Sequence, residues 1–191
     1  MAYRHYETLG LVLGSQPRNE ANRLYQIYTA DFGLIKVLAQ GVRLEKSKLR
    51  YNLQDFGLSH LTLVRGKEFW RLTGAEKEGD LNPQRVVFFR KISSILLRLI
   101  QGESAHSAIF KDLEKAWQLL SETEISKDDL LNLEIFIIIR LLFELGYLAK
   151  SDLTQSVFWA EDFSWTEIRS LQVEKNNLIR LINLTLSETG L

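Results

Sequence analysis

The sequence contains no cysteine among its 191 residues. Disulfide bonds, thiolate metal sites and cysteine nucleophiles are therefore excluded, and nothing in the composition indicates an oxidising compartment. The composition is otherwise that of an ordinary globular protein, with 46% hydrophobic and 25% charged residues. A chain of this length has room for one domain or for two small ones.

Long uninterrupted apolar runs are also absent. Residues 1–7 lack the apolar core of a signal peptide, so we expect a cytoplasmic protein. The most apolar stretch, residues 130–148, is interrupted by Glu134, Arg140 and Glu144, and burying three charges in lipid would be costly. We therefore expect no association with a membrane, and we interpret this stretch as a core helix that is surrounded by other helices.

Motifs of catalysis and metal binding are scarce. The segment 65–67 is superficially like a phosphate loop, but Leu61 and Glu68 stand where such a loop needs glycine and Ser or Thr. Neither G-x-S-x-G nor H-E-x-x-H occurs. The histidines lie far apart, without the spacing of metal ligands: His5, His60 and His106. The sequence therefore predicts a protein that is not an enzyme and that has no cofactor.

The net charge of zero conceals two halves of opposite sign. Residues 1–78 contain 12 Lys and Arg against 8 Asp and Glu, whereas residues 79–191 contain 12 against 16. A positive surface favours polyanionic partners. We therefore expect the two halves to prefer different partners.

The N-terminal half has the period-2 pattern of β-strands, punctuated by turn residues. Five such segments are predicted as strands: 7–13, which leads into a turn at 14–17, then 23–29, 33–40, 58–65 and 69–75. Short antiparallel strands in fewer than eighty residues are best covered when they close into a barrel. We expect an OB-type barrel, although an SH3-like barrel fits five strands as well.

From residue 82 onward the pattern becomes helical. Asn82 precedes a proline at the first helical position, Ser104 can begin a second helix, and Ser126 begins a capping box. Gly146 is expected to end this third helix, and residues 165–187 are predicted as a fourth. The fold class is therefore α+β, with an OB-type barrel in residues 1–78 and a helical domain in residues 79–191.

Positive charge is concentrated in and after the third predicted strand. This segment contains one acid, Glu45, and five cations: Lys36, Arg43, Lys46, Lys48 and Arg50. Gly41 marks where the strand gives way to a loop that could present them. A solvated loop, charged only for solubility, is the alternative interpretation.

Other cations alternate with aromatic residues, a combination that suits single-stranded nucleic acid, because phosphates attract charge and unpaired bases stack on flat rings. The further candidate cations are Arg23, Arg65, Lys67 and Arg71. The candidate stacking residues are Tyr25, Tyr51 and Trp70. Tyr25 and Trp70 fit the interior of a barrel equally well.

Several segments of the first eighty residues resemble the RecO family. They are Leu-Gly-Ser at 13–15, Asn-Glu-Ala-Asn-Arg at 19–23, Thr-Ala-Asp-Phe-Gly-Leu-Ile at 29–35, Leu-Ala-Gln-Gly-Val-Arg at 38–43, Leu-Val-Arg-Gly at 63–66 and Trp-Arg-Leu-Thr at 70–73. The second half is similar more loosely, through Leu-Phe-Glu-Leu-Gly-Tyr at 142–147.

This resemblance implies an OB-fold followed by a helical domain and a non-catalytic function in DNA recombination and in the repair of DNA damage. Family members bind single- and double-stranded DNA, contact RecR and single-stranded DNA-binding protein, promote strand annealing and help to load RecA. By position, Lys36, Arg43, Lys46, Lys48 and Arg23 fall where the family is basic.

One departure from the family pattern follows from the absence of cysteine. Many members carry a four-cysteine zinc site after the Leu-Gly-Tyr stretch, and this chain has residues 149–164 there, with several aromatic residues and no cysteine. A zinc site of that kind is therefore excluded.

Two other functions share the same sequence features. An OB protein that binds RNA needs the same charge and stacking surfaces. A protein-interaction scaffold could carry the charge incidentally.

Overall fold

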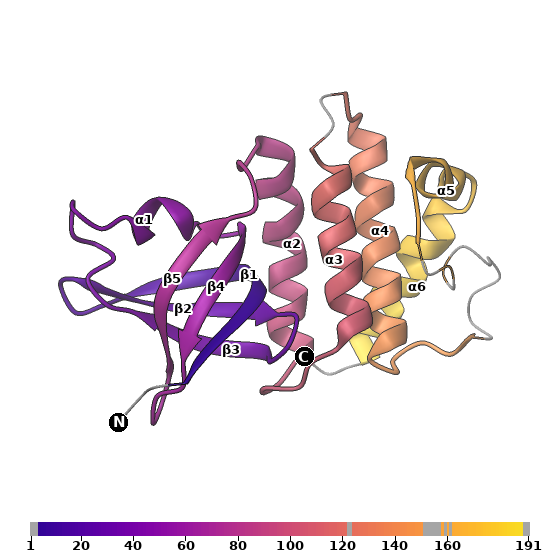
Figure 1. Cartoon of the computed structure of the whole chain (residues 1–191). Coiled ribbons are helices and arrows are strands. Elements are labelled where there is room, and N and C mark those ends of the chain that lie inside the picture. Colours follow the sequence, from indigo (N-terminus) through magenta and orange to yellow (C-terminus); the bar gives the residue numbers. More distant parts are fainter. Residues whose placement is uncertain (1–3, 122–123, 151–157, 159, 161, 189–191) are drawn as a thin grey trace. The chain divides into compact units, whose positions relative to one another are not determined.

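The computed structural model describes residues 4–121, 124–150, 158, 160 and 162–188 (Figure 1). The chain divides into two compact units, Met1–Ser107 and Ala108–Leu191. The barrel strands end at Lys77, next to the predicted boundary, but the first unit continues through one further helix. The predicted division of functions between residues 1–78 and 79–191 stays a prediction.

Five strands form a closed barrel in the order β1-β2-β3-β5-β4. Only β3 and β5 are paired in parallel, through Val37 with Trp70 and Leu38 with Arg71. A short helix, α1 (Leu49–Asn52), lies between β3 and β4 in the chain and contacts β5. The strand bounds are β1 His5–Arg18, β2 Asn22–Thr29, β3 Gly33–Ala39, β4 Leu58–Val64 and β5 Trp70–Lys77. The predicted OB-type barrel and the α+β fold class are confirmed.

The first strand is much longer than predicted, because the expected turn at residues 14–17 is wrong. The register shifts between Val12 and Gly14, and this bulge bends the strand. Residues 5–11 of β1 pair with β4, and residues 10–18 pair with β2. Gly14 and Pro17, which are typical of turns, therefore lie within a bent strand that joins two sides of the barrel.

The barrel interior is filled by the alternate residues of the strands, as period-2 patterning requires. Ile27, Ile35 and Val37 are buried there. Gly10 on β1 lets two neighbouring side chains pack close to the backbone, since a Cβ at this position would lie 2.7 Å from side-chain carbons of Ile27 and Leu61.

The helix α2 (Pro83–Leu99) begins as predicted. The Asn82 side chain accepts a hydrogen bond of 2.8 Å from the backbone N–H of Arg85, and Pro83 occupies the first helical position. This helix contacts β1 within the first unit.

The second helix, α3 (Ser107–Leu119), begins three residues later than predicted at Ser104. Gly102 has a φ of +77°, which interrupts any helix there. Glu103 bonds to the barrel residues Arg65 and Trp70, and the carbonyl of His106 accepts from the Tyr28 hydroxyl. These contacts hold the segment before α3 against the barrel in a non-helical conformation.

The core helix is α4 (Lys127–Glu144). The predicted capping box is confirmed, since the Ser126 hydroxyl accepts from the backbone N–H of Asp129 and the Asp129 carboxylate accepts from that of Ser126. The helix ends before Gly146, which has a φ of +80°. No helix of the described residues has the length and apolar character needed to cross a membrane.

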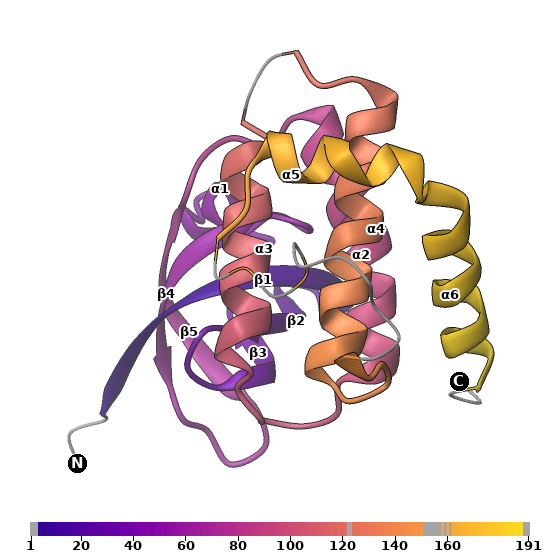
Figure 2. The same cartoon turned by 90° about the vertical axis from the view of Figure 1, so that its right-hand side faces the viewer.

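The predicted fourth helix is divided into three parts, so the single helix expected over residues 165–187 is wrong. They are α5 (Trp165–Ser170), the 3-10 turn η3 (Leu171–Val173) and α6 (Lys175–Glu188). The break comes at Glu174, whose φ of −107° and ψ of 7° are not helical. Figure 2 shows α5 lying across one end of α4, and α6 turning to run alongside it.

Arg140 explains how a charge is buried in the core helix. Its Nε donates to Asp112 on α3 at 2.7 Å, and its Nη1 donates to the carbonyls of Phe158 at 3.2 Å and Ala160 at 2.7 Å. These hydrogen bonds give Nε and Nη1 of the buried guanidinium polar partners inside the second unit, which offsets the cost of burying its charge. Of the segment 149–164, residues 151–157, 159 and 161 lie outside the described residues.

Candidate nucleic-acid interface

The segment that follows β3 presents four of the predicted cations to solvent. Arg43, Lys46, Lys48 and Arg50 are all exposed. The chain turns sharply after β3 at Gly41, whose φ is +65°. The segment then forms a series of turns, with the backbone N–H of Leu44 bonded to the carbonyl of Gly41 and that of Ser47 to the carbonyl of Leu44.

This segment is fastened to the turn between β1 and β2. Arg43 donates its backbone N–H to the Ala21 carbonyl and its Nη1 to the Asn19 carbonyl, each at 3.0 Å. The Asn22 side chain accepts from the backbone N–H of Gly41 at 2.9 Å. The cations after β3 and the turn before β2 therefore form one surface, although about twenty residues separate them in sequence.

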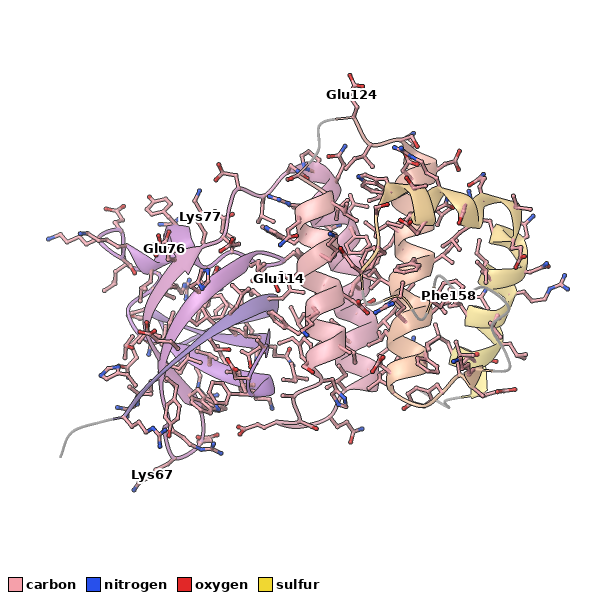
Figure 3. All side chains as sticks on the ribbon, turned by 45° about the vertical axis from the view of Figure 1, so that its right-hand side comes forward. Lys67, Glu76, Lys77, Glu114, Glu124 and Phe158 are labelled. Atoms are coloured by element: carbon pink, nitrogen blue, oxygen red, sulfur yellow. The ribbon has the colours of Figure 1, made fainter. Side chains whose placement is uncertain are left out.

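The β4–β5 hairpin carries a second group of cations around a hollow of about 500 Å³. We call this hollow the hairpin groove, and its walls are Leu38, Val64, Arg65, Gly66, Lys67, Glu68, Phe69 and Arg71. It combines three cations and one acid with apolar side chains. Figure 3 shows Lys67 projecting at the tip of the hairpin, at the opposite end of β5 from Glu76 and Lys77.

Arg18 links these two cationic regions, and sequence reasoning missed it. Its guanidinium lies 4.8 Å from the centre of the Phe69 ring, which lines the hairpin groove, while its neighbour Asn19 receives Arg43. Arg18 is exposed at the end of β1. The misassigned turn at residues 14–17 hid it, because only the extended strand carries Arg18 to the hairpin.

Arg65 is the most constrained cation of the groove. Its Nη2 donates to the Glu103 carboxylate at 3.0 Å, and its guanidinium lies 5.1 Å from the centre of the Trp70 ring. Arg71 lies on the outer side of β5, opposite Leu38 of the parallel strand β3. Lys36 is exposed two residues earlier on β3, so it belongs to the same outer face.

The structure separates the three candidate stacking residues. Tyr25 and Trp70 are 2% and 3% exposed in the barrel core, so in this conformation neither ring is open to a base. Trp70 packs edge to face against Tyr6, with the ring centres 5.4 Å apart. Tyr51 in α1 is 65% exposed, and Leu44, which no pattern had indicated, is 57% exposed beside the cations.

Arg23 lies less openly than its pattern suggested. It is half-buried at the start of β2, and its Nε is buried without a hydrogen-bond partner among the described residues. Burial raises the pKa of the neighbouring Tyr25, while the Arg23 charge acts to lower it and Asp55 acts to raise it. Arg23 therefore belongs to the end of the barrel interior more than to its outer surface.

The histidines do not come together in a metal site. His60 Nε2 lies 2.7 Å from the Glu78 carboxylate on the barrel surface. No group of three or more His, Asp or Glu in the described part of the chain could hold a metal ion.

Comparison with known proteins gives a family match over the barrel. Residues 1–78 match the family described as "Recombination protein O N terminal". This match ends one residue after β5.

Several curated relatives bear the name DNA repair protein RecO. The protein of Gloeothece citriformis is 37% identical over 71 residues, covering 37% of this chain and 25% of the relative. That of Heliobacterium modesticaldum is 33% identical over 127 residues, covering 62% and 45%. That of Dehalococcoides mccartyi is 29% identical over 125 residues, covering 62% and 49%. The chain thus spans between a quarter and a half of the length of these relatives.

Proposed function

The chain is a member of the RecO family through its N-terminal 78 residues, and from this premise we propose that its barrel binds the sugar-phosphate backbone of DNA during repair and recombination. The surface that would do so combines the cations after β3, the β1–β2 turn and the hairpin groove. Its candidate residues are Arg18, Lys36, Arg43, Lys46, Lys48, Arg50, Arg65, Lys67 and Arg71, with Arg23 near its edge.

The observation that carries this proposal is the convergence of three sequence segments on one cationic surface. Arg43 bonds to the β1–β2 turn, and Arg18 at the same turn lies over Phe69 of the hairpin groove. Side chains that only make a loop soluble do not need hydrogen bonds or ring contacts to neighbouring segments. Phosphates recur along a nucleic-acid chain, so several cations arranged along one surface release several counterions on binding.

The exposed Tyr51 and Leu44 add a contact for bases. A flat ring beside cations can stack on an unpaired base, which a duplex does not offer without distortion. We infer that the segment after β3 accepts single strands as well as duplex backbone.

The finer functions of the family are proposals for this chain. We infer that it promotes annealing of complementary strands and helps to load RecA together with RecR, without catalysis of its own. Nucleic-acid binding is assigned to residues 1–78, and contact with RecR and single-stranded DNA-binding protein to residues 79–191. The opposite charge of the two halves supports this division of partners.

The salt dependence of binding tests the central proposal. If about five cations contact a single strand, the logarithm of the binding constant should fall with that of the salt concentration with a slope near −3.5. A fluorescein-labelled oligothymidylate, measured by anisotropy over a series of salt concentrations, gives this slope. A slope near zero, or no binding of the oligothymidylate at low salt, would refute backbone binding and favour the protein-interaction scaffold.

Two further measurements separate DNA repair from RNA binding. Competition between DNA and RNA oligonucleotides of matched sequence should favour DNA or show no preference, and a strong preference for RNA would support an RNA-binding function. Acceleration of strand annealing on DNA coated with its cognate single-stranded DNA-binding protein would support mediator function directly.

A further inference from the structure

The Glu103 carboxylate occupies a binding position for an anion on the barrel. Its Oε2 accepts from Arg65 Nη2 at 3.0 Å, and its Oε1 accepts from Trp70 Nε1 at 3.1 Å. Each oxygen of one anion therefore has its own donor. The Trp70 ring is buried in the barrel core, which fixes the direction of its N–H.

Arg65 belongs at the same time to the hairpin groove, whose other cations are Lys67 and Arg71. Its guanidinium is held against the Trp70 ring, 5.1 Å from the ring centre. One cation thus serves two places, the anion position filled by Glu103 and the wall of the groove. An anion that enters the groove must share Arg65 with Glu103 or take it over.

A phosphate group can take the place of the carboxylate on Arg65. Both anions present two oxygens in one plane, and the guanidinium of arginine binds either with charge-assisted hydrogen bonds. Phosphate contact in the groove would in addition bring the charges of Lys67 and Arg71 close to the anion, which Glu103 at its present position does not use.

The backbone on either side of Glu103 fixes its position. The chain bends at Gly102, whose φ is +77°, just before Glu103. The next residue, Ser104, is packed against the β2–β3 turn so closely that a Cβ on Gly33 would lie 2.2 Å from its carbonyl oxygen. The carboxylate is therefore held at the groove by the fold of the first unit.

We propose that Glu103 is an internal substitute for a phosphate group and that nucleic acid entering the hairpin groove displaces it from Arg65. The groove is then a phosphate subsite, in which Arg65, Lys67 and Arg71 hold one backbone phosphate. This inference rests on the proposed function and adds how one of its subsites is regulated. Glu103 and the nucleic acid compete for Arg65, and this competition lowers the affinity for nucleic acid.

The test replaces Glu103→Gln and compares it with Glu76→Gln. Both changes remove one negative charge from the first unit, but Glu76 is exposed at the far end of β5 from the hairpin tip (Figure 3). Glutamine keeps an oxygen that can accept from Trp70, so the segment is expected to stay in place. The probe is an oligothymidylate of about 20 nucleotides, longer than the roughly 4–16 nucleotides that one OB fold covers.

Glu103→Gln is expected to tighten binding about twofold to fivefold at low salt, since the ion pair that it removes is partly exposed. The salt slope should become more negative by up to about 0.7, because Arg65 becomes free to replace a counterion. Glu76→Gln should change affinity by less than twofold. In an Arg65→Ala background, Glu103→Gln should have no further effect, because the two residues act through one contact.

Equal effects of Glu103→Gln and Glu76→Gln would overturn the inference, as would a gain that persists without Arg65. Either result leaves the wild-type salt slope intact, so the proposed function would survive. Failure of the wild-type protein to bind the probe at any salt concentration would instead refute the proposed function itself, and the subsite with it.

Discussion

Alanine at Arg43, Lys46 and Lys48 together is the most direct perturbation of the proposed interface. The three side chains are exposed on the segment after β3, so their loss should remove backbone contacts without disturbing the barrel. We expect binding to weaken to a similar extent for unrelated DNA sequences, since phosphate contacts carry no base information.

The expected size of the loss follows from counterion release. Each lost contact reduces the magnitude of the slope by about 0.7 for a single strand, so three should reduce it by about 2. At roughly 0.1 M salt this corresponds to a loss in affinity on the order of a hundredfold.

The effect on stability should be small by comparison. Arg43 donates one exposed hydrogen bond from its Nη1 to Asn19, and its backbone bond to Ala21 remains when the side chain is removed. Surface substitutions of this kind usually change the free energy of unfolding by no more than about 0.5 kcal/mol each. The melting temperature should therefore shift by only about 2–4 °C for each kcal/mol in a chain of this size.

The assay is fluorescence anisotropy over a salt series, with thermal unfolding of the same samples. The matched control replaces three exposed cations of the second unit, Lys111, Lys127 and Arg180, by alanine. Our reasoning would be refuted by equal loss of binding in the control or by an unchanged slope in the Arg43, Lys46 and Lys48 variant. Loss of stability in proportion to loss of binding would favour a structural role for the segment.

Three further predictions concern stability. Arg140→Met should lower the free energy of unfolding by about 3 kcal/mol, measured by urea unfolding, because Asp112 stays buried without its cation. The loss should be smaller at acid pH, since burial already raises the pKa of Asp112 and the protonated carboxyl needs no cation. An unchanged urea midpoint would contradict this. Hydrogen bonds from Arg169 hold the pKa of Asp129 below its ordinary value, so Asp129 stabilises the fold above about pH 4 and loses this effect as the pH falls through the lowered pKa; Arg169→Gln should flatten the acid limb of a stability curve against pH. Gly33→Ala should lower the free energy of unfolding by at least about 1 kcal/mol, because its φ is +67° and the new Cβ would meet a backbone carbonyl oxygen at 2.2 Å; a neutral effect in calorimetry would show that the turn can rearrange.

Much of the barrel could be predicted because its signals are local. Four of the five strands lie within about two residues of their predicted bounds, since alternation and turn residues define them. The exception is β1, where the glycine of a bulge and a proline near the strand end have the composition of a turn. Local sequence cannot distinguish a bent strand with two partners from a short strand followed by a turn.

The candidate site was predictable in its charge but not in its arrangement. The run of five cations from Lys36 to Arg50 is visible in the sequence, and the structure exposes all five. Tyr25 and Trp70 could not be assigned to the surface or to the core, because alternation does not tell which face of a strand is the interior. Arg18 and Glu103 join the site only through contacts across more than thirty residues, which no local pattern encodes.

Arg140 holds part of the segment 149–164, which we call the connector, in place within the second unit without any cysteine. A metal site closes a chain segment by placing several ligands on one ion, and a guanidinium can do the same with hydrogen bonds. Arg140 binds a carboxylate of α3 and two connector carbonyls, and the Phe136 and Phe163 rings lie within 6 Å of its charge. The closure therefore depends on one buried ion pair, which makes it sensitive to substitution at Asp112 and, unlike a zinc module, insensitive to chelators.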